Sequence, residues 1–320
     1  MAETNIRGIF GIGEIRKRQV SGLVPERTRE TYREYGYFGG GFSGARVSTI
    51  DRIDYSNDTA TASVRGPLSI TKAYSGATGN SNFGYFGGGE PAIATVDRVD
   101  YSNDSAKASV RGSLSNGTSY GRMAIGNSNY AYWGGSYTPS PIIYRSLLER
   151  IDYSNDLATP IPRGSLPLIT RMGPGSLSRD NTFGYYATGL ATGPGASATV
   201  CRITYPNDTA VMLFRGSVTV SRRLVGQCTG NKNFGYVAGT NGAVSGSTVD
   251  RIDYSNDLAT STPRGPLSSP TISVAASGNS NFGYFGGGAP GPLSIIQRID
   301  YSNDTATASV RGPLSSSRYG

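Results

Sequence analysis

An eight-residue phrase close to Asp-Arg-Ile-Asp-Tyr-Ser-Asn-Asp recurs six times along the chain. The copies begin at Asp51, Asp97, Glu149, Cys201, Asp250 and Gln297, so successive copies are 46, 52, 52, 49 and 47 residues apart. A period near 50 residues indicates an array of similar supersecondary units that bury their hydrophobic surface against one another. Residues shared by all six units therefore build the array, and function is expected where the copies differ or outside them.

Each repeat contains four short strand patterns separated by turn residues. In the second copy the strands are expected at 73–79, which is rich in small residues, and at 83–86, 95–101 and 105–110. Asn80-Ser-Asn82 and Ser102-Asn-Asp104 have the Asn/Asp/Ser composition of tight turns. Four antiparallel strands of this kind form one blade of a β-propeller. No helical periodicity is present in the array, so the sequence predicts an all-β protein.

The repeat resembles the kelch repeat. Tyr85-Phe86-Gly87-Gly88 matches the aromatic strand that ends in a glycine pair, and Ile53 to Asn57 matches the tyrosine-bearing strand with its Asn turn. The chain departs from that family in its fourth strand, which usually carries Trp and here has Ala or Ser. The resemblance implies a kelch-like propeller over about residues 28–320.

Six aromatic strands and six phrases predict six blades. Their approximate ranges are 28–70, 71–116, 117–168, 169–220, 221–269 and 270–320. Arg27 to Thr31 is the candidate innermost strand of blade 1, which would make each blade one continuous stretch. The alternative is that the two termini share a blade.

Charged positions also recur in every copy. A charge covered by neighbouring blades must be paired, so we expect Arg65 to pair with Asp58 or Asp54 of its own blade, and likewise around the array. A ring of anion sites is the alternative. The predicted structural ion-pair residues are Arg52, Asp54, Asp58, Arg65, Arg98, Asp104, Arg111, Arg150, Asp156, Arg163, Arg202, Asp208, Arg215, Arg251, Asp257, Arg264, Arg298, Asp304 and Arg311.

Composition argues against several classes of enzyme. The chain has no histidine, which excludes Ser-His-Asp and Cys-His catalysis and His-ligated metal sites. Its glycine-rich runs lack the Lys-Ser/Thr of a phosphate-binding loop, and unique carboxylates are few. Cys201 and Cys228 are expected to be free, buried thiols. We therefore predict no catalytic residue, no metal site and no cofactor. The net charge of +8 is spread over the repeats, so no nucleic-acid partner is predicted.

The segment before the repeats, residues 1–27, is predicted to be an attachment arm. It contains an apolar, Gly-rich run followed by basic residues, and an arm of this kind would be exposed without a partner. A disordered tail is the alternative. The candidate partner-binding residues are Ile9, Phe10, Ile12, Ile15, Arg16, Lys17 and Arg18. The arm would dock on another protein or on a second copy of the chain.

The loops after the aromatic strands differ between copies. In the third copy Trp133, Tyr137 and Tyr144 form a local aromatic concentration, and we take them as candidate surface contacts for a sugar or a protein. Turn filling and packing between blades would explain the same residues.

The phrases Asn-Ser-Asn-Phe-Gly-Tyr-Phe-Gly-Gly-Gly and Asp-Arg-Ile-Asp-Tyr-Ser-Asn-Asp resemble those of repeat-rich propeller proteins of tailed phages of aquatic bacteria, especially cyanophages. That resemblance implies a virion component such as a fibre or decoration protein, with other virion proteins and a host glycan or protein as partners. No signal peptide and no membrane span are expected. A free carbohydrate-binding lectin is the second hypothesis. A hydrolase or oxidase in the central funnel is the third, and the absent histidine counts against it.

Overall fold

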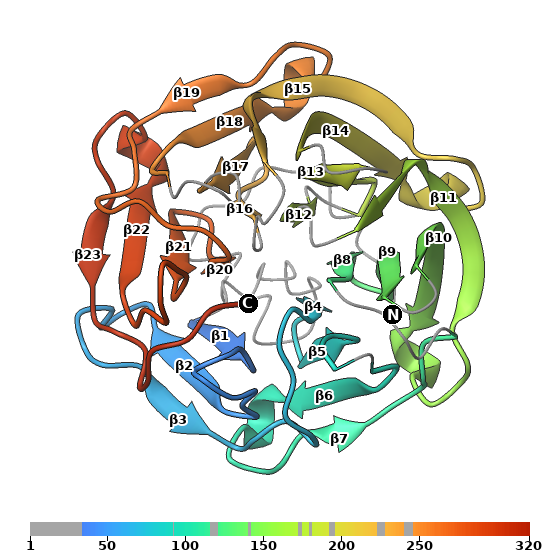
Figure 1. Cartoon of the computed structure of the whole chain (residues 1–320), viewed down its shortest axis with the longest axis horizontal. Helices are drawn as coiled ribbons and strands as arrows, with labels where there is room; N and C mark the ends of the chain where they lie inside the picture. Colours follow the sequence, from blue (N-terminus) through green and yellow to red (C-terminus); the bar gives the residue numbers. More distant parts are fainter. Residues whose placement is uncertain are drawn as a thin grey trace, which may run out of the picture. The chain divides into compact units, whose positions relative to one another are not determined.

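The computed structural model describes residues 34–320, except 92, 116–120, 140–141, 172–174, 179–180, 192–195, 223–227 and 240–245. Arg33–Gly320 forms one compact unit. Within it, six antiparallel blades lie around a common axis as a β-propeller (Figure 1). The fold class predicted from the repeats is therefore confirmed. The predicted arm, 1–27, and the candidate inner strand, Arg27 to Thr31, lie outside the described residues.

The strands follow the repeats closely. Blade 1 has β1 (Tyr35–Gly39), β2 (Ile50–Asp54) and β3 (Ser63–Arg65), and blade 2 has β4 (Gly76–Gly79), β5 (Phe83–Gly87), β6 (Val96–Asp100) and β7 (Ser109–Val110). Blade 3 has β8 (Met123–Gly126), β9 (Tyr130–Pro139), β10 (Ile142–Asp152) and β11 (Ile161–Arg171). Blade 4 has β12 (Gly175–Ser178), β13 (Phe183–Ala191), β14 (Ala196–Thr204) and β15 (Leu213–Arg222). Blade 5 has β16 (Thr229–Gly230), β17 (Phe234–Ala238), β18 (Val249–Asp253) and β19 (Thr262–Arg264), and blade 6 has β20 (Ala275–Gly278), β21 (Phe282–Gly286), β22 (Ile296–Asp300) and β23 (Ser309–Arg311).

Short 3-10 helices form the turns between the third and fourth strands of five blades. They are η1 (Tyr101–Asn103), η2 (Tyr153–Asn155), η3 (Tyr205–Asn207), η4 (Tyr254–Asn256) and η5 (Tyr301–Asn303). Where an aspartate precedes the turn, it accepts hydrogen bonds from the second turn residue, whereas in blade 4 Thr204 stands there and makes no such bond. In blade 1, Asp54 Oδ1 accepts from the Ser56 amide at 2.8 Å and from the Ser56 hydroxyl at 2.6 Å. This local bonding explains the Asp-Tyr-Ser-Asn sequence without any metal ion.

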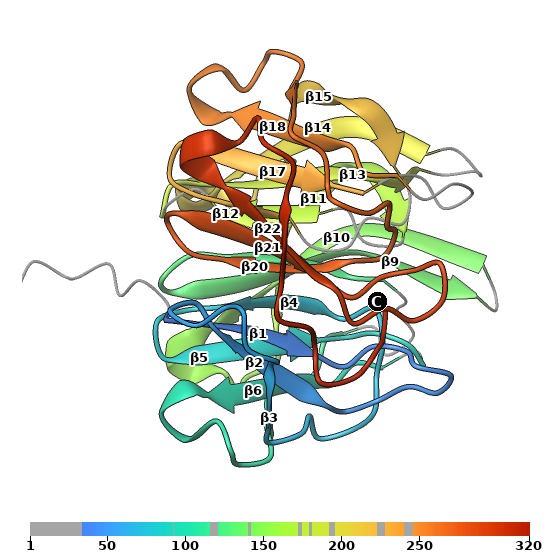
Figure 2. The same ribbon diagram turned by 90° about the vertical axis from the view of Figure 1, so that its left-hand side faces the viewer.

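The two faces of the disc carry different connections. Because Phe83 pairs with Asp100, the turn after the first strand and the turn after the third strand lie at the same end of a blade. We call that side the turn face and the opposite side the loop face. The aromatic strands all end at the loop face, so the described parts of the loops that follow them, where the copies differ, lie there. The long hairpin of β9 and β10 extends there, on the right-hand side of Figure 2.

Blades 3 and 4 are joined into one eight-stranded sheet. The end of β11 crosses from the outer edge of blade 3 and pairs with β13 of blade 4, at Thr170 with Ala191 and at Arg171 with Leu190. In the other described blades the outer strand stops after two or three residues. The longer β11 and β15 therefore make this part of the array different from the rest.

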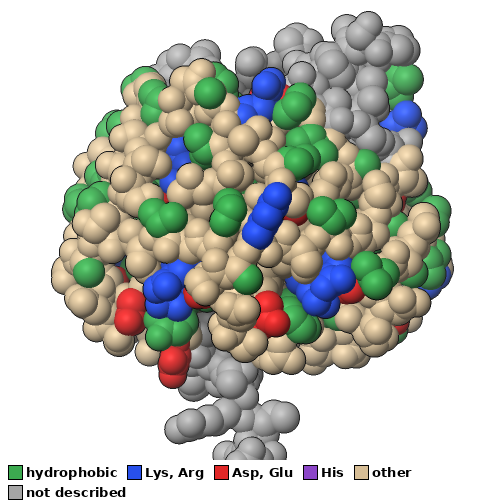
Figure 3. All heavy atoms as spheres, turned by 90° about the horizontal axis from the view of Figure 1, so that it is seen from below, with side chains coloured by type: hydrophobic (Ala, Val, Ile, Leu, Met, Phe, Trp, Pro, Cys, Tyr) green, Lys and Arg blue, Asp and Glu red, His purple; other side chains and the backbone are tan. Residues whose placement is uncertain are grey.

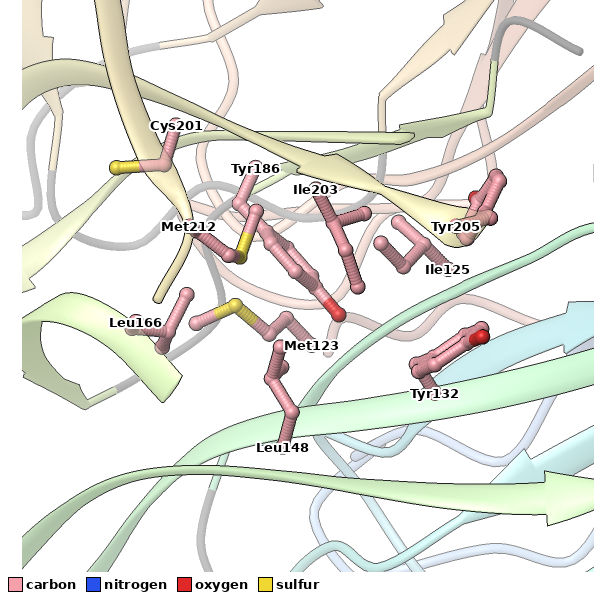
Figure 4. Packing of buried hydrophobic residues seen from close by; sticks show 10 residues of the cluster. All are labelled: Met123, Ile125, Tyr132, Leu148, Leu166, Tyr186, Cys201, Ile203, Tyr205 and Met212. Atoms are coloured by element: carbon pink, nitrogen blue, oxygen red, sulfur yellow. The ribbon is translucent and has the colours of Figure 1, made fainter. Parts of the chain in front are cut away.

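The hydrophobic core lies between blades. Figure 4 shows one such cluster, in which Met123 and Leu148 of blade 3 meet Tyr186 and Ile203 of blade 4, with Met212 beside them. Five further clusters join other neighbouring blades in the same way. A single blade is thus unable to bury its apolar side chains, as the repeat period predicts. Cys201 and Cys228 are free and buried, also as predicted.

Candidate functional site

The recurring arginines and aspartates form six clusters, one at each interface between blades. In the first, Asp104 of blade 2 accepts from the Tyr37 hydroxyl and from Arg52 Nη1 of blade 1, both at 2.8 Å, and Arg65 Nε lies 3.6 Å away. The expected partners of Arg65 within its own blade were wrong, because the outer strand of one blade lies against the third-strand turn of the next. Asp54 instead caps its own turn. The arginines are occupied by these carboxylates, so the cluster gives no support to a ring of anion sites.

The same geometry closes the ring from blade 6 to blade 1. The tyrosine-to-aspartate hydrogen bonds are 2.8–3.0 Å, and the arginine Nη1 bonds are 2.7–2.9 Å. The remaining clusters centre on Asp156 (Tyr85, Arg98, Arg111), Asp208 (Tyr132, Arg150, Arg163), Asp257 (Tyr185, Arg202, Arg215), Asp304 (Tyr236, Arg251, Arg264) and Asp58 (Tyr284, Arg298, Arg311).

Aromatic contacts hold each cluster from both sides. The Tyr37 ring stacks on Tyr101 of the next blade with 4.9 Å between centroids, and the Arg52 guanidinium lies 4.1 Å from the centre of the Tyr35 ring. Burial, together with the hydrogen bond to Asp104, raises the pKa of Tyr37 well above its ordinary value, so its hydroxyl stays protonated and donates. These groups bond neighbouring blades to one another.

A second set of charges is buried more deeply than the first. The first residue of the phrase is an acid in four blades, and each acid meets a cation from the connection into its blade. Lys72 Nζ lies 2.8 Å from Asp97, Arg222 Nη1 lies 2.6 Å from Asp250, and all four of these side chains are fully buried. Arg122 pairs with Glu149, and Arg318 with Asp51 at 3.0 Å. These cations do not recur at one spacing, so no repeat pattern in the sequence points to them.

Blade 6 shows why these charges come in pairs. Its phrase begins with Gln297, and Thr271 stands where blade 2 has Lys72, seven residues before the end of the inner strand. Both side chains are fully buried. Gln297 Oε1 accepts from the Ser268 hydroxyl at 2.8 Å and from the Ser269 amide at 3.0 Å. Acid and cation are replaced together, as expected when an unpaired buried charge is costly.

A cavity of about 310 Å³ opens around the axis on the turn face. Its wall includes Tyr35, Tyr37, Thr78, Thr229 and Ser277, with glycines at the ends of four inner strands. None of the described residues that line it is an acid, a lysine or an arginine. Thr229 and Ser277 are held by tyrosines of the following blades, Tyr301 at 2.9 Å and Tyr55 at 2.7 Å. The cavity offers hydroxyl and aromatic surface of a kind that suits ligand binding.

The aromatic residues singled out in the third copy lie apart from that cavity. Trp133 was expected at the surface and is instead fully buried. Its ring lies against Gly87 of blade 2, where a side chain has no room, and its Nε1 donates to the Gly76 carbonyl at 3.2 Å. Trp133 is therefore a packing residue. Tyr137 and Tyr144 are paired across the β9–β10 hairpin of the loop face, and their role as contacts stays a prediction. The arm candidates, from Ile9 to Arg18, lie outside the described residues.

Comparison with known proteins identifies the fold alone. No protein-family model matches the chain, and no curated protein matches its sequence. A solved structure described as "Structure of YjhT" has the same architecture, with a TM-score of 0.67 over 87% of this chain and 95% of that one, at 11% identity. The likeness supports the six-bladed propeller. In the described part of the chain, no helix is long and apolar enough to cross a membrane.

Proposed function

We propose that the protein is a non-enzymatic structural or adhesion component, a phage virion appendage or decoration protein attached through residues 1–27, whose propeller contacts a host or partner. The observation that carries the proposal is the use of the recurring polar groups. In the described residues, the recurring arginines, aspartates and tyrosines bond neighbouring blades. A disc whose blades are bonded in this way is a rigid platform. The six repeats differ from one another in the loops of its loop face.

The attachment role is tested by solution mass. Light scattering is measured for the full chain and for a chain that begins at Pro25. Assembly of the full chain, with a monomeric shorter chain, supports an arm that serves assembly. Monomers in both samples contradict self-assembly through the arm.

A carbohydrate-binding lectin is the second candidate, and the axial cavity favours it. Tyrosine rings beside small hydroxyl side chains suit stacking on a sugar and hydrogen bonding to it. A glycan array probed with the full chain tests this function. Thr307 is exposed just before β23, the outer strand of blade 6, and serves as the control position. Binding that is lost in Thr78→Val, while Thr307→Val binds as the wild type, would support the cavity as the site.

A further inference from the structure

One tyrosine on the loop face has a backbone conformation that tyrosine rarely adopts. Tyr74, just before the inner strand of blade 2, has a φ of +56°. A bulky side chain in this left-handed region is an outlier, because its Cβ crowds the following carbonyl oxygen. Blade 3 has Gly121 at the equivalent position, five residues before the end of its inner strand, and glycine tolerates the positive φ there. Backbone strain of this kind is concentrated at ligand-binding and catalytic sites, so the surroundings of the Tyr74 ring indicate its role.

The Tyr74 ring belongs to an aromatic cluster to which three blades contribute. The ring centroids of Tyr74 and Tyr319 are 6.3 Å apart, and those of Tyr319 and Phe42 are 5.5 Å apart. Backbone bonds fix the three segments, since the Tyr74 amide donates to the Gly320 carbonyl at 3.0 Å and the Phe42 amide to the Tyr319 carbonyl at 2.8 Å. All three rings are partly exposed. We call Phe42, Tyr74 and Tyr319 the loop-face cluster.

An ion pair between blades 1 and 2 adjoins this cluster. Arg46 Nη2 lies 2.7 Å from Glu90 Oε1, and the two side chains are 34% and 22% exposed. Both residues are attached to the cluster through the backbone, because Arg46 forms a β-bridge with Phe42, and Glu90 forms one with Ala73, directly before Tyr74. The pair adds both hydrogen-bond donors and acceptors to the aromatic surface, and the two charges compensate each other.

The tyrosine hydroxyls of the cluster are available to a ligand. The tyrosines between the blades donate to aspartates, as Tyr37 does to Asp104. In the described structure, by contrast, neither the Tyr74 hydroxyl nor the Tyr319 hydroxyl has a hydrogen-bond partner. Burial, with Tyr319 and Glu90 nearby, raises the pKa of Tyr74 to about 12, so its hydroxyl stays protonated and can donate.

The loop-face cluster is particular to this part of the ring. The β-bridge that joins Phe42 to Tyr319 has an equivalent in blade 6, where Ala289 and Ile272 stand at the two positions. On the edge of the disc that carries β3 and β7, hydrophobic side chains are instead scattered among polar surface (Figure 3). The cluster therefore lies where the copies differ, which is where function is expected.

We propose that the loop-face cluster binds a neutral saccharide. One face of a sugar ring packs on the exposed aromatic rings, and its hydroxyls bond to the tyrosine hydroxyls and to the Arg46–Glu90 pair. An uncharged ligand fits because the cation and the anion of that pair already compensate each other. The inference rests on the proposed contact with a host or partner and names the chemistry of that contact. The site lies on the opposite face of the disc from the axial cavity.

An array of neutral oligosaccharides probed with the full chain tests the proposal. We expect affinity for the tightest-binding oligosaccharide to fall at least about tenfold in Tyr74→Gly and in Glu90→Gln, equivalent to roughly 1.4 kcal/mol. Ser273→Gly is the matched control, because Ser273 occupies the same position in blade 6 with a φ of +54°, and it should bind as the wild type does. Glycine adopts this φ readily, and thermal melting followed by circular dichroism confirms that each variant is folded.

Three results would overturn the proposal. One is a full chain that binds no neutral oligosaccharide on the array. Another is binding that Tyr74→Gly leaves unchanged or that Ser273→Gly weakens equally. The third is binding that is lost in Thr78→Val and kept in Tyr74→Gly, which would assign it to the axial cavity. Attachment through residues 1–27 is tested separately by light scattering, so a failure of the saccharide site is distinguishable from a failure of the arm.

Discussion

At the scale of single residues, one aspartate holds three groups of the neighbouring blade. The Asp104 carboxylate accepts from Tyr37 and Arg52 and lies within ion-pair distance of Arg65. Replacing it with alanine leaves two partly buried guanidinium groups without their counter-charge. We expect Asp104→Ala to lower the free energy of unfolding by about 3–5 kcal/mol. Denaturant unfolding followed by tyrosine fluorescence measures the loss.

The matched control is Asp100→Ala in the same turn. Asp100 is exposed and bonds only locally to Ser102, so a loss of about 1 kcal/mol is expected. Equal losses in the two variants would show that the cluster between blades contributes nothing beyond the turn.

The buried charge pairs allow a second test at this scale. Blade 2 has a charged pair, Lys72 and Asp97, where blade 6 has the neutral residues Thr271 and Gln297. Lys72→Thr alone leaves Asp97 buried and unpaired, and Asp97→Gln alone does the same to Lys72. The double variant reproduces the Thr271 and Gln297 arrangement of blade 6. We expect each single change to cost about 3–5 kcal/mol and the double change to cost less than either. A double-mutant cycle that shows additive losses would contradict this coupling.

At the scale of elements, an Arg-Gly pair lies within or directly at the end of each outer strand, and its glycine contacts the next blade. The Gly216 amide donates to the Asp257 carbonyl at 2.7 Å, and a Cβ on Gly216 would lie 1.9 Å from the Ala259 carbonyl oxygen. Five further glycines make the same approach at the other interfaces. Glycine is required here by the contact between blades rather than by its backbone angles.

Gly216→Ala should therefore force blades 4 and 5 apart, with a loss of about 3 kcal/mol. Gly44→Ala is the control, since nothing lies within 4 Å of its Cβ position and its φ of +91° is the only obstacle, which costs about 1 kcal/mol. Thermal unfolding by circular dichroism ranks the two. A Gly216→Ala protein as stable as Gly44→Ala would mean that the turn of blade 5 at Ala259 moves away from position 216 at no cost.

At the scale of the whole molecule, the C-terminal segment helps to close the ring. Arg318 pairs with Asp51 of blade 1 and donates to the Phe38 carbonyl at 3.2 Å, and the Tyr319 ring lies 5.5 Å from that of Phe42. Deleting 316–320 removes these contacts and leaves Asp51 without its cation. We expect a loss of about 3–5 kcal/mol, whereas a chain that lacks only Tyr319 and Gly320 keeps the ion pair and loses less. Urea unfolding of both chains separates the contributions.

The pH dependence of stability is also a property of the whole molecule. Burial opposes ionisation of Glu149, but Arg122 and the Ser115 amide outweigh it and hold the pKa below its ordinary 4.5. Hydrogen bonds from serines lower the pKa values of Asp54, Asp100, Asp253 and Asp300 below 3.8. As pH falls, the unfolded chain takes up these protons before the folded one does, so protonation favours unfolding.

We therefore expect stability to be complete above about pH 5 and to fall as the pH decreases through 4 and 3. Between about pH 5 and 8 it should be nearly constant, because the chain has no histidine. Melting temperatures in a pH series measure this profile. A marked change near pH 6.5 would contradict it.

The sequence by itself determined the architecture. The period and the aromatic and Asn/Asp phrases predicted six all-β blades, and their strands lie where the repeats indicate. The strands and turns could be predicted because they depend on interactions between residues that are close together in the sequence. The recurring charged positions were also found, but their partners were not, because the pairs form between blades rather than within them.

Only the tertiary structure decided which groups meet. In the folded chain Trp133 is buried, and β11 joins blades 3 and 4. Lys72, Arg122 and Arg222 each pair with an acid 25–28 residues away in the sequence. Arg318 pairs with Asp51, near the other end of the described chain. The physical reason is the same throughout: contacts between blades depend on how the ring closes, and no local pattern encodes that closure.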